Sequence, residues 1–296
     1  MSQDRFNCPI CGGELRVIPK FDLYSECVKC KCLSTKFLYN EDQIRDYYSS
    51  YITDEVEEFG SEIRGRVTQK IVDLGSINSA KSLYDFGFGS GIFLQEAILL
   101  GLDCFGYEYS DGLVEKGMGL GATIENLTQL HSQDSPKVDI FIVIETLEHL
   151  VLPREVMQTA FNRLNKLGVL YMTTPNGRSL NRRLLGGRWS IFNPPEHITV
   201  FSAAGIHVLL QEIGFTNISI STTGFNPYDL LGAIRKSPRS TDSGFSYDGT
   251  KRTETSRTLI SLSDRNILFR LLFKLVNGLL ELFRSGDSLK IIARKP

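Results

Sequence analysis

Residues 82–93 read SLYDFGFGSGIF and combine a predicted buried strand, a glycine turn and the start of a predicted helix. Gly87, Gly89 and Gly91 form the G-x-G-x-G turn, and Asp85 lies just before it. A turn of this kind is where an open α/β sheet binds a nucleotide-like ligand. From residue 82 to 175, short apolar runs alternate with helical stretches. This alternation predicts an α/β fold, with a parallel sheet covered by helices on both faces.

The residues around the turn indicate which nucleotide-like ligand it binds. Ile92 occupies the place where a dinucleotide fingerprint requires a third small residue, and the chain has no G-x-x-x-x-G-K-[ST] phosphate loop. The Asp85 carboxylate would be unfavourable beside a pyrophosphate but favourable beside an ammonium group. Glu108, which ends the next predicted strand, suits a ribose diol. A nucleoside at one end and an amino acid at the other describe S-adenosylmethionine.

From about residue 80 to 225 the chain resembles the class I S-adenosylmethionine-dependent methyltransferases, most closely a broad bacterial subgroup. The motifs that carry this resemblance are Asp85–Gly91 (DxGxGxG), Glu108, Glu145–His149 (E-x-x-E-H), Thr174–Asn176 (TPN) and Pro195–Ser202 (P-x-H-x-x-x-FS). The resemblance implies a Rossmann-like fold with a mostly parallel seven-stranded sheet, and methyltransferase activity. The cofactor-binding residues that it implies are Asp85, Gly87, Phe88, Gly89, Gly91, Glu108, Tyr109, Glu125, Asn126, Leu127 and Glu145.

Five of the six cysteines crowd the first 32 residues. Two C-x-x-C pairs, Cys8/Cys11 and Cys27/Cys30, are separated by fifteen residues, a spacing typical of a four-cysteine zinc site. Four sulfur ligands leave no open coordination position, so the predicted zinc is structural. Cys32 offers an alternative to Cys30 as a ligand, and both assignments stay open. Several members of the subgroup carry such an N-terminal zinc ribbon.

The strand VDIFIVIE (138–145) ends in Glu145 and is followed by Glu148 and His149. If a helix or turn begins at Glu145, Glu148 and His149 lie on its same face. The site resembles the E-x-x-E-H of ubiquinone-biosynthesis O-methyltransferases and of small-RNA 2′-O-methyltransferases, in which a downstream histidine, here His197, completes a metal site.

Three interpretations of this catalytic site stay open. His149 or His197 acts as a metal-free general base, or Glu145, Glu148, His149 and His197 bind Mg²⁺ or Mn²⁺, or Glu148 and His149 only organise the pocket floor.

The predicted reaction is O-methylation of a hydroxyl on a small molecule or a glycan precursor. The resemblance suggests sugar or surface-polysaccharide substrates. An RNA 2′-O-methyltransferase is the alternative enzyme, although a net charge of −1 does not favour nucleic-acid binding. A module that binds S-adenosylmethionine or a partner without catalysis is a third hypothesis. Arg178, Arg182, Arg183, Arg188 and Trp189 form either a lid that recognises a phosphate or carboxylate, or a solvated basic face with one packed tryptophan.

We predict a zinc ribbon at 1–40, a helical linker or cap at 41–78, and a methyltransferase domain at 79–296 with an insertion at about 228–286. Within the insertion, residues 236–262 are predicted to form a loop. The apolar helix at 265–284 either docks on the domain or another subunit, or lies on a membrane surface. The sequence does not define an oligomeric state. The N-terminus lacks the features of a signal peptide, so a cytoplasmic location is expected.

Overall fold

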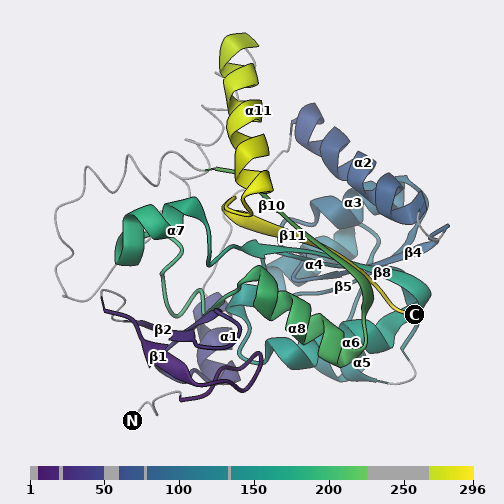
Figure 1. Ribbon diagram of the computed structural model, residues 1–296. Helices are drawn as coiled ribbons and strands as arrows, with labels where there is room; N and C mark the ends of the chain where they lie inside the picture. Colours follow the sequence, from purple (N-terminus) through teal and green to yellow (C-terminus); the bar gives the residue numbers. More distant parts are fainter. Residues whose placement is uncertain (1–5, 20–22, 50–59, 77–78, 133–134, 226–266) are drawn as a thin grey trace.

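Seven strands form the central sheet of the computed structural model, which describes residues 6–19, 23–49, 60–76, 79–132, 135–225 and 267–296 (Figure 1). The strand order is β10-β11-β8-β7-β4-β5-β6. Strands β4 to β8 run parallel, whereas β11 is antiparallel to both of its neighbours. The predicted mostly parallel α/β sheet is therefore confirmed. The strands are β4 (Ser82–Phe86), β5 (Asp103–Tyr107), β6 (Thr123–Ile124), β7 (Val138–Ile144), β8 (Leu164–Pro175), β10 (Thr216–Thr223) and β11 (Ser288–Arg294).

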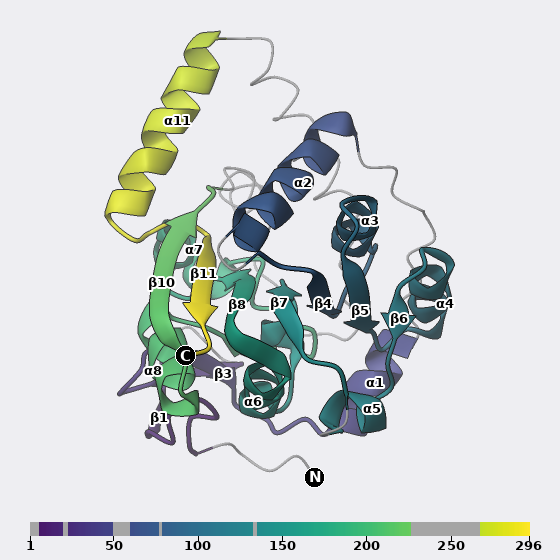
Figure 2. The same cartoon turned by 90° about the vertical axis from the view of Figure 1, so that its right-hand side faces the viewer.

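Helices cover both faces of this sheet, as Figures 1 and 2 show. One face carries α2 (Ser61–Ser76), α3 (Ile92–Leu99) and α4 (Asp111–Gly119). The other carries α5 (Leu127–His131), α6 (Pro153–Arg163) and α8 (Ala203–Ile213).

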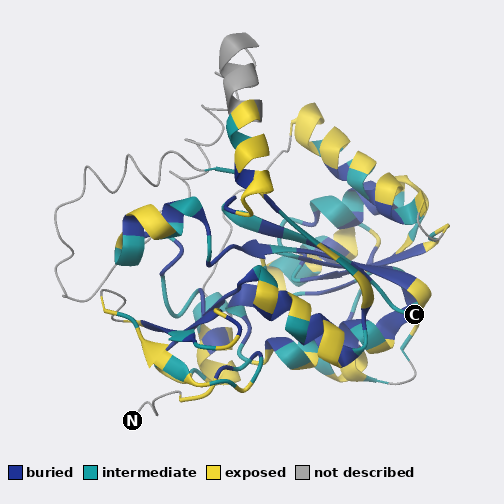
Figure 3. Ribbon diagram, viewed as in Figure 1, coloured by how far each residue is buried: buried dark blue, intermediate teal, exposed yellow. Residues whose placement is uncertain are grey.

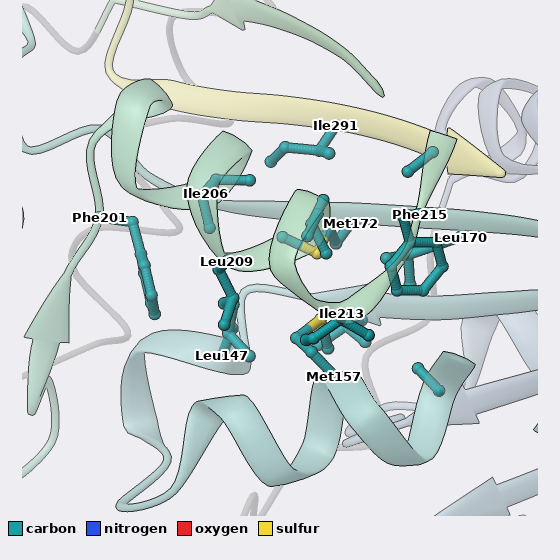
Figure 4. Packing of buried hydrophobic residues seen from close by; sticks show 14 of the residues in the cluster. Leu147, Met157, Leu170, Met172, Phe201, Ile206, Leu209, Ile213, Phe215 and Ile291 are labelled. Atoms are coloured by element: carbon teal, nitrogen blue, oxygen red, sulfur yellow. The ribbon is translucent and has the colours of Figure 1, made fainter. Parts of the chain in front are cut away.

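Each face buries an apolar cluster, and Figure 3 shows the buried residues concentrated in the sheet. In Figure 4, Met157 of α6 and Leu209 of α8 lie among Leu170 and Met172 of β8. Burial of apolar side chains between helices and sheet supplies the main favourable term in folding.

Two elements differ from the sequence-based prediction because of local capping and backbone geometry. The apolar run that follows α4 forms only the two-residue strand β6, since Asn126 forms a capping box with Gln129 and starts α5. The turn after β7 is a 3-10 helix, η1 (Leu147–His149), which begins two residues after Glu145. Glu145 itself has a φ of 47°, so the chain turns sharply at the end of the strand.

A second, four-stranded sheet contains the N-terminal cysteines. Its order is β1 (Leu15–Val17), β2 (Tyr24–Cys27), β3 (Leu33–Thr35) and β9 (Thr199–Val200). We call β1 to β3 and the adjoining cysteines the ribbon. Since β9 comes from the segment that follows Pro195, one sheet contains both the ribbon and the main part of the chain.

Three shorter helical elements lie around this second sheet and the edge of the central one. They are α1 (Glu41–Ser49), α7 (Leu180–Leu185) and the 3-10 helix η2 (Gly186–Arg188). Trp189, which follows η2, packs on Phe192 and is fully buried with Tyr24 and Leu33 of the ribbon. Trp189 is therefore packed in the interior, as one of the two sequence-based interpretations expects.

Helix α11 (Ile267–Leu282) precedes β11 and projects from the body of the protein in Figures 1 and 2. Leu275, Leu279 and Leu282 on it are exposed. Within the described residues, no helix combines the length and apolarity needed to cross a membrane. The predicted loop at 236–262 lies outside the described residues, and the domain boundaries stay a prediction.

Candidate active site and cysteine cluster

Asp85 lies at the carboxyl side of β4 with its side chain almost completely buried. Its Oδ1 atom accepts no hydrogen bond from the described residues. Burial, and then the charge of Glu108, raise the pKa of the Asp85 carboxyl well above its usual range. A buried acid without a partner is costly. An ammonium group at this position would compensate that cost, so the residue fits the amino-acid end of S-adenosylmethionine.

Glu108 follows β5 and faces the glycine loop, residues 87–91. Its Oε2 accepts a hydrogen bond from the Gly89 N–H at 3.0 Å, and its Oε1 accepts from the Tyr109 N–H at 2.7 Å. The carboxylate is thereby held beside the loop, where its remaining lone pairs can accept hydrogen bonds from a ribose diol.

The glycine loop touches the end of β7 through Gly87. Gly87 has a φ of 71°, and a Cβ atom there would lie 2.4 Å from Cγ2 of Thr146. Gly89, also at positive φ (48°), has no atom within 4 Å of such a Cβ and faces open space. The loop therefore has one glycine fixed by a close contact and another on the side where a ligand can approach. Gly91 is the N-cap of α3.

Phe88 has a different position from its glycine neighbours. Its ring is buried against Gly106 and Gly117, where an added Cβ would come within 2.9 and 2.7 Å of it. Only the main chain of Phe88 lies in the glycine loop. The ring instead fixes the loop to β5 and α4.

A pocket with a mixed lining, which includes Glu41, His131 and Glu155, adjoins Tyr109 and Leu127. Its wall also includes Ile44 of α1, Phe86 of β4 and Leu150. Tyr109 directly follows Glu108, so the pocket lies next to the carboxylate that suits a ribose. The adenine contacts of Tyr109 and Leu127 stay a prediction, which the position of both residues beside Glu108 and this pocket makes possible to test.

Glu125 and Asn126 have structural partners. The Glu125 carboxylate forms a bidentate pair with the Arg163 guanidinium at 2.7 and 3.1 Å, and both side chains are buried. Asn126 caps α5 with its side chain. The sequence-based assignment of these side chains to adenine binding therefore competes with contacts that they already make.

Glu148, His149 and His197 come together at the end of β7. One ligand atom from each lies within 4.8 Å of the others, and we call this group the histidine cluster. The two imidazole rings have centroids 4.8 Å apart. Glu145 is outside this group: its side chain is exposed, and its Oε1 accepts a hydrogen bond from Ser288 Oγ at 3.0 Å. Three of the four predicted residues thus form the possible metal-binding group, while the exposed Glu145 carboxyl lies beside Glu148.

Main-chain carbonyl groups define the tautomer of both histidines. His149 Nδ1 lies 2.7 Å from the Glu196 carbonyl oxygen, and His197 Nδ1 lies 2.6 Å from that of Ile191. Because a carbonyl only accepts hydrogen bonds, we assign the ring proton to Nδ1 in both cases. With this tautomer, a ring in its neutral form keeps a lone pair on Nε2. His149 Nε2 is 3.8 Å from Oε1 of Glu148.

The pKa shifts of His149 and Glu148 both favour the neutral forms of these side chains. Burial, followed by the nearby His197, lowers the pKa of His149 to about 4. Burial and the charge of Glu145 raise the pKa of Glu148 well above its usual range. A neutral imidazole can accept a proton or bind a cation. A bound cation would favour ionised Glu148.

The cysteine cluster consists of Cys8, Cys11, Cys27 and Cys30, whose sulfur atoms lie within 4.8 Å of one another. The Cys8–Cys30 and Cys11–Cys27 sulfur pairs are each 3.5 Å apart. A tetrahedral zinc ion with bonds of about 2.3 Å requires sulfur separations of about 3.8 Å. The four thiols, none in a disulfide, therefore fit a structural zinc site.

Cys32 lies outside this cluster. Its Sγ accepts the N–H of Ser202 at 3.4 Å, and a Cβ added to Gly205 would lie 2.1 Å from it. Of the two alternatives for the fourth ligand, the geometry favours Cys30.

The predicted basic stretch has a partner in the ribbon. Arg182 and Arg178 reach Glu26 of β2 at 3.0 and 3.6 Å, whereas Arg183 and Arg188 are exposed. Half of the proposed lid arginines thus hold the ribbon against α7.

Sequence reasoning missed two tyrosines of the site. Tyr48 of α1 places its hydroxyl 2.6 Å from His149 Nδ1, and Tyr24 of β2 donates to the His197 carbonyl oxygen at 2.5 Å. Both contacts join residues far apart in the chain. No local pattern could have indicated them.

Comparisons with known proteins agree with the fold and identify the family. A family model described as a methyltransferase domain matches residues 59–220. A SAM-dependent methyltransferase from Archaeoglobus fulgidus is 15% identical with a TM-score of 0.51, covering 79% of this chain and 93% of its own. A possible histamine N-methyltransferase from Thermotoga maritima is 14% identical with a TM-score of 0.50, covering 86% and 99%.

Magnesium protoporphyrin IX methyltransferase from Synechocystis, solved with bound SAH, is 15% identical with a TM-score of 0.50, covering 64% of this chain and 95% of its own. No curated protein matches the chain. At these identities the solved structures show a shared fold, while the family model covers more than half of the sequence. The chain belongs to the methyltransferase-domain family and is an S-adenosylmethionine-dependent methyltransferase.

Proposed function

We propose that the protein methylates a hydroxyl oxygen on a small molecule or glycan precursor, and that the acceptor binds at the histidine cluster. The observation that carries this proposal is the pair of adjacent histidines at the end of β7, each with its Nδ1 beside a main-chain carbonyl oxygen. Methyl transfer to a hydroxyl requires removal of the hydroxyl proton. An Nε2 lone pair beside the acceptor supplies the base for that step.

The two ends of the site have separate tasks. S-adenosylmethionine, when bound, supplies the methyl group. Asp85 would hold its ammonium group and Glu108 its ribose, while Tyr109 and Leu127 face the adenine. The contact between Thr146 and Gly87 supports this arrangement, because it brings the end of β7 next to the glycine loop. The acceptor oxygen would then meet the methyl group beside His149.

A divalent cation at Glu148, His149 and His197 is the second candidate for activating the hydroxyl. Histidines that ligate metals usually donate their other ring N–H to a carbonyl or carboxylate, as both rings do here. One carboxylate and two imidazoles would leave positions for acceptor oxygens. Such an ion lowers the pKa of a bound hydroxyl. Glu145 is the predicted ligand that this arrangement omits.

For the N-terminal segment we propose a structural zinc ion on Cys8, Cys11, Cys27 and Cys30, in a ribbon at 1–40. Elemental analysis of the purified protein should give one zinc per chain. Cys27→Ser should lower that ratio, while Cys104→Ser, which changes a cysteine of β5, should leave it unchanged. A zinc ratio near zero in protein prepared without chelators would contradict the assignment.

The acceptor class can be tested by transfer of a labelled methyl group to sugar nucleotides, lipid-linked glycans, quinone precursors and RNA. Each arm is run with and without added Mg²⁺ or Mn²⁺. Labelled ether products on a small molecule support the proposal, and label on the ribose of RNA would replace it with the RNA alternative. Label on nitrogen or carbon would exclude hydroxyl methylation.

A further inference from the structure

The segment that carries His197 is the fourth strand of the ribbon sheet. Leu33 and Ser34 of β3 pair with Val200 and Thr199 of β9. The Thr35 N–H also donates to the Ile198 carbonyl oxygen at 3.0 Å. The main chain that follows His197 is therefore held by ladder hydrogen bonds to the N-terminal module.

The ribbon also binds the His197 peptide itself. The Tyr24 hydroxyl donates to the His197 carbonyl oxygen at 2.5 Å, and the tyrosine is almost completely buried. On the other side, the Ile198 N–H donates to the Glu148 carbonyl oxygen at 2.8 Å. His197 thus lies between a ribbon side chain and the turn that bears Glu148 and His149.

The cysteine cluster holds the two strands that make these contacts. Tyr24 and Cys27 belong to the same four-residue strand, β2. The Cys27 N–H donates to the Cys32 carbonyl oxygen at 2.8 Å, which closes the turn into β3. A module of this size does not bury enough apolar surface to fold alone, and a metal ion supplies the missing stabilisation.

The residues proposed to bind the cofactor come from different elements of the fold. Asp85, the glycine loop and Glu108 come from β4, β5 and the loops that follow them, and Phe88 anchors the loop to β5 and α4. These elements belong to the central sheet. Loss of the ribbon metal should therefore affect the two sides of the active site unequally.

We infer that the metal-loaded cysteine cluster holds the acceptor side of the active site in place, and that Tyr24 is a positioning residue for His197. The meaning of "acceptor side" rests on the proposed function; the coupling between ribbon and His197 does not. In this arrangement the ribbon positions one part of the active site.

The test measures the NMR signals of the histidine ring nitrogens. The chain has four histidines, His131, His149, His197 and His207, so the imidazole nitrogen spectrum of ¹⁵N-labelled protein is simple. His131, bonded to Thr159 through Nδ1, and His207 on α8 serve as internal references. Signals are assigned by replacing the four histidines one at a time. The variants are Tyr24→Phe, with Tyr39→Phe as its control, and Cys11→Ser, with Cys104→Ser as its control.

We expect Tyr24→Phe and Cys11→Ser to shift the His197 signals while the reference signals stay unchanged. The dissociation constant of S-adenosylmethionine, measured by calorimetry, should stay within about twofold. With an identified acceptor, Tyr24→Phe should reduce turnover about 5–10-fold. Both control variants should resemble the wild type.

Unchanged His197 signals in a Cys11→Ser protein shown to lack the metal would overturn the inference. So would equal loss of cofactor binding and of all four histidine signals, which would mean general unfolding. Failure of the proposed function is a separate result: no hydroxyl acceptor would be found, while the histidine spectra would still report the coupling.

Discussion

The main-chain N–H of Ile198 donates to the carbonyl oxygen of Glu148 at 2.8 Å, which joins the two segments that carry the paired histidines. The rings of His149 and His197 lie with centroids 4.8 Å apart. The geometry of each histidine therefore depends on a segment distant in sequence.

Replacement of the histidines should separate catalysis from cofactor binding. We expect His149→Gln to lower turnover by about 10²–10⁴-fold, the usual contribution of a general base. Affinity for S-adenosylmethionine, measured by calorimetry, should change little. His207→Gln on α8 is the control. If the reaction needs no cation, activity will also survive exhaustive chelation in protein that keeps its ribbon zinc; loss of activity there favours the metal interpretation.

Asp85→Asn should weaken the cofactor and not the fold. Loss of a charged hydrogen-bond partner for the ammonium group should raise the dissociation constant about 10–100-fold. The protein without cofactor should keep or gain thermal stability, since the variant removes a buried, unpaired carboxylate. Asp103→Asn, at the exposed start of β5, provides the control. Unchanged cofactor affinity in Asp85→Asn would refute the assignment.

Cofactor binding should be linked to proton release from Asp85. Its pKa is raised by burial in the folded protein, so the folded state without cofactor binds this proton more tightly than the unfolded chain. The corresponding stability is therefore full at pH below about 3.9 and is lost as pH rises through the raised value. An ammonium ligand reverses the preference. Affinity should rise with pH in that window, and calorimetry in buffers of different ionisation enthalpy should detect the released proton. Asp85→Asn should abolish both effects.

Two glycines of the same loop should respond differently to alanine. Gly87→Ala places a methyl group against Thr146 at positive φ and should destabilise the protein by about 2–4 kcal/mol. Gly89→Ala meets no neighbour and should cost about 1 kcal/mol from its backbone conformation. Its main effect should be weaker cofactor binding. Denaturant unfolding and calorimetry measure the two effects, and equal destabilisation by both substitutions would contradict this description of the loop.

The buried pair of Glu125 and Arg163 offers a test of its structural role. Glu125→Gln leaves the buried guanidinium without its charge partner and should destabilise the protein by about 3–5 kcal/mol. Glu62→Gln, which alters the exposed pair with Arg66, should change stability by less than about 0.5 kcal/mol. If the Glu125 carboxylate instead serves adenine, the substitution will weaken S-adenosylmethionine binding with little effect on unfolding.

The sheet and the glycine turn were accessible to sequence reasoning because their signals are local. The run from Ser82 to Ile92 contains a strand, a glycine turn and a helix start in consecutive residues, and β4 and α3 follow it closely. Spacing also identified Cys8, Cys11 and Cys27 of the cysteine cluster, but left Cys30 and Cys32 as alternatives for its fourth member.

Features that depend on long-range contacts could not be predicted from local sequence patterns. Glu145 has a positive φ and the 3-10 helix starts only at Leu147, so an even helical spacing from Glu145 was a poor guide there. The Arg163 partner of Glu125 and the tyrosine partners of the histidines come from distant segments. Pairing of β3 with β9 likewise follows from tertiary structure, because β9 has only two residues.

The position of β11 between β8 and β10 has a consequence for biosynthesis. In the order of translation, β8 and β10 both precede β11, so each has an unpaired edge in the nascent chain until the last of the three strands emerges. Unpaired strand edges are templates for contact with other chains. Aggregation during expression, or a need for chaperones, should therefore depend on how quickly the segment containing β11 is synthesised and inserted.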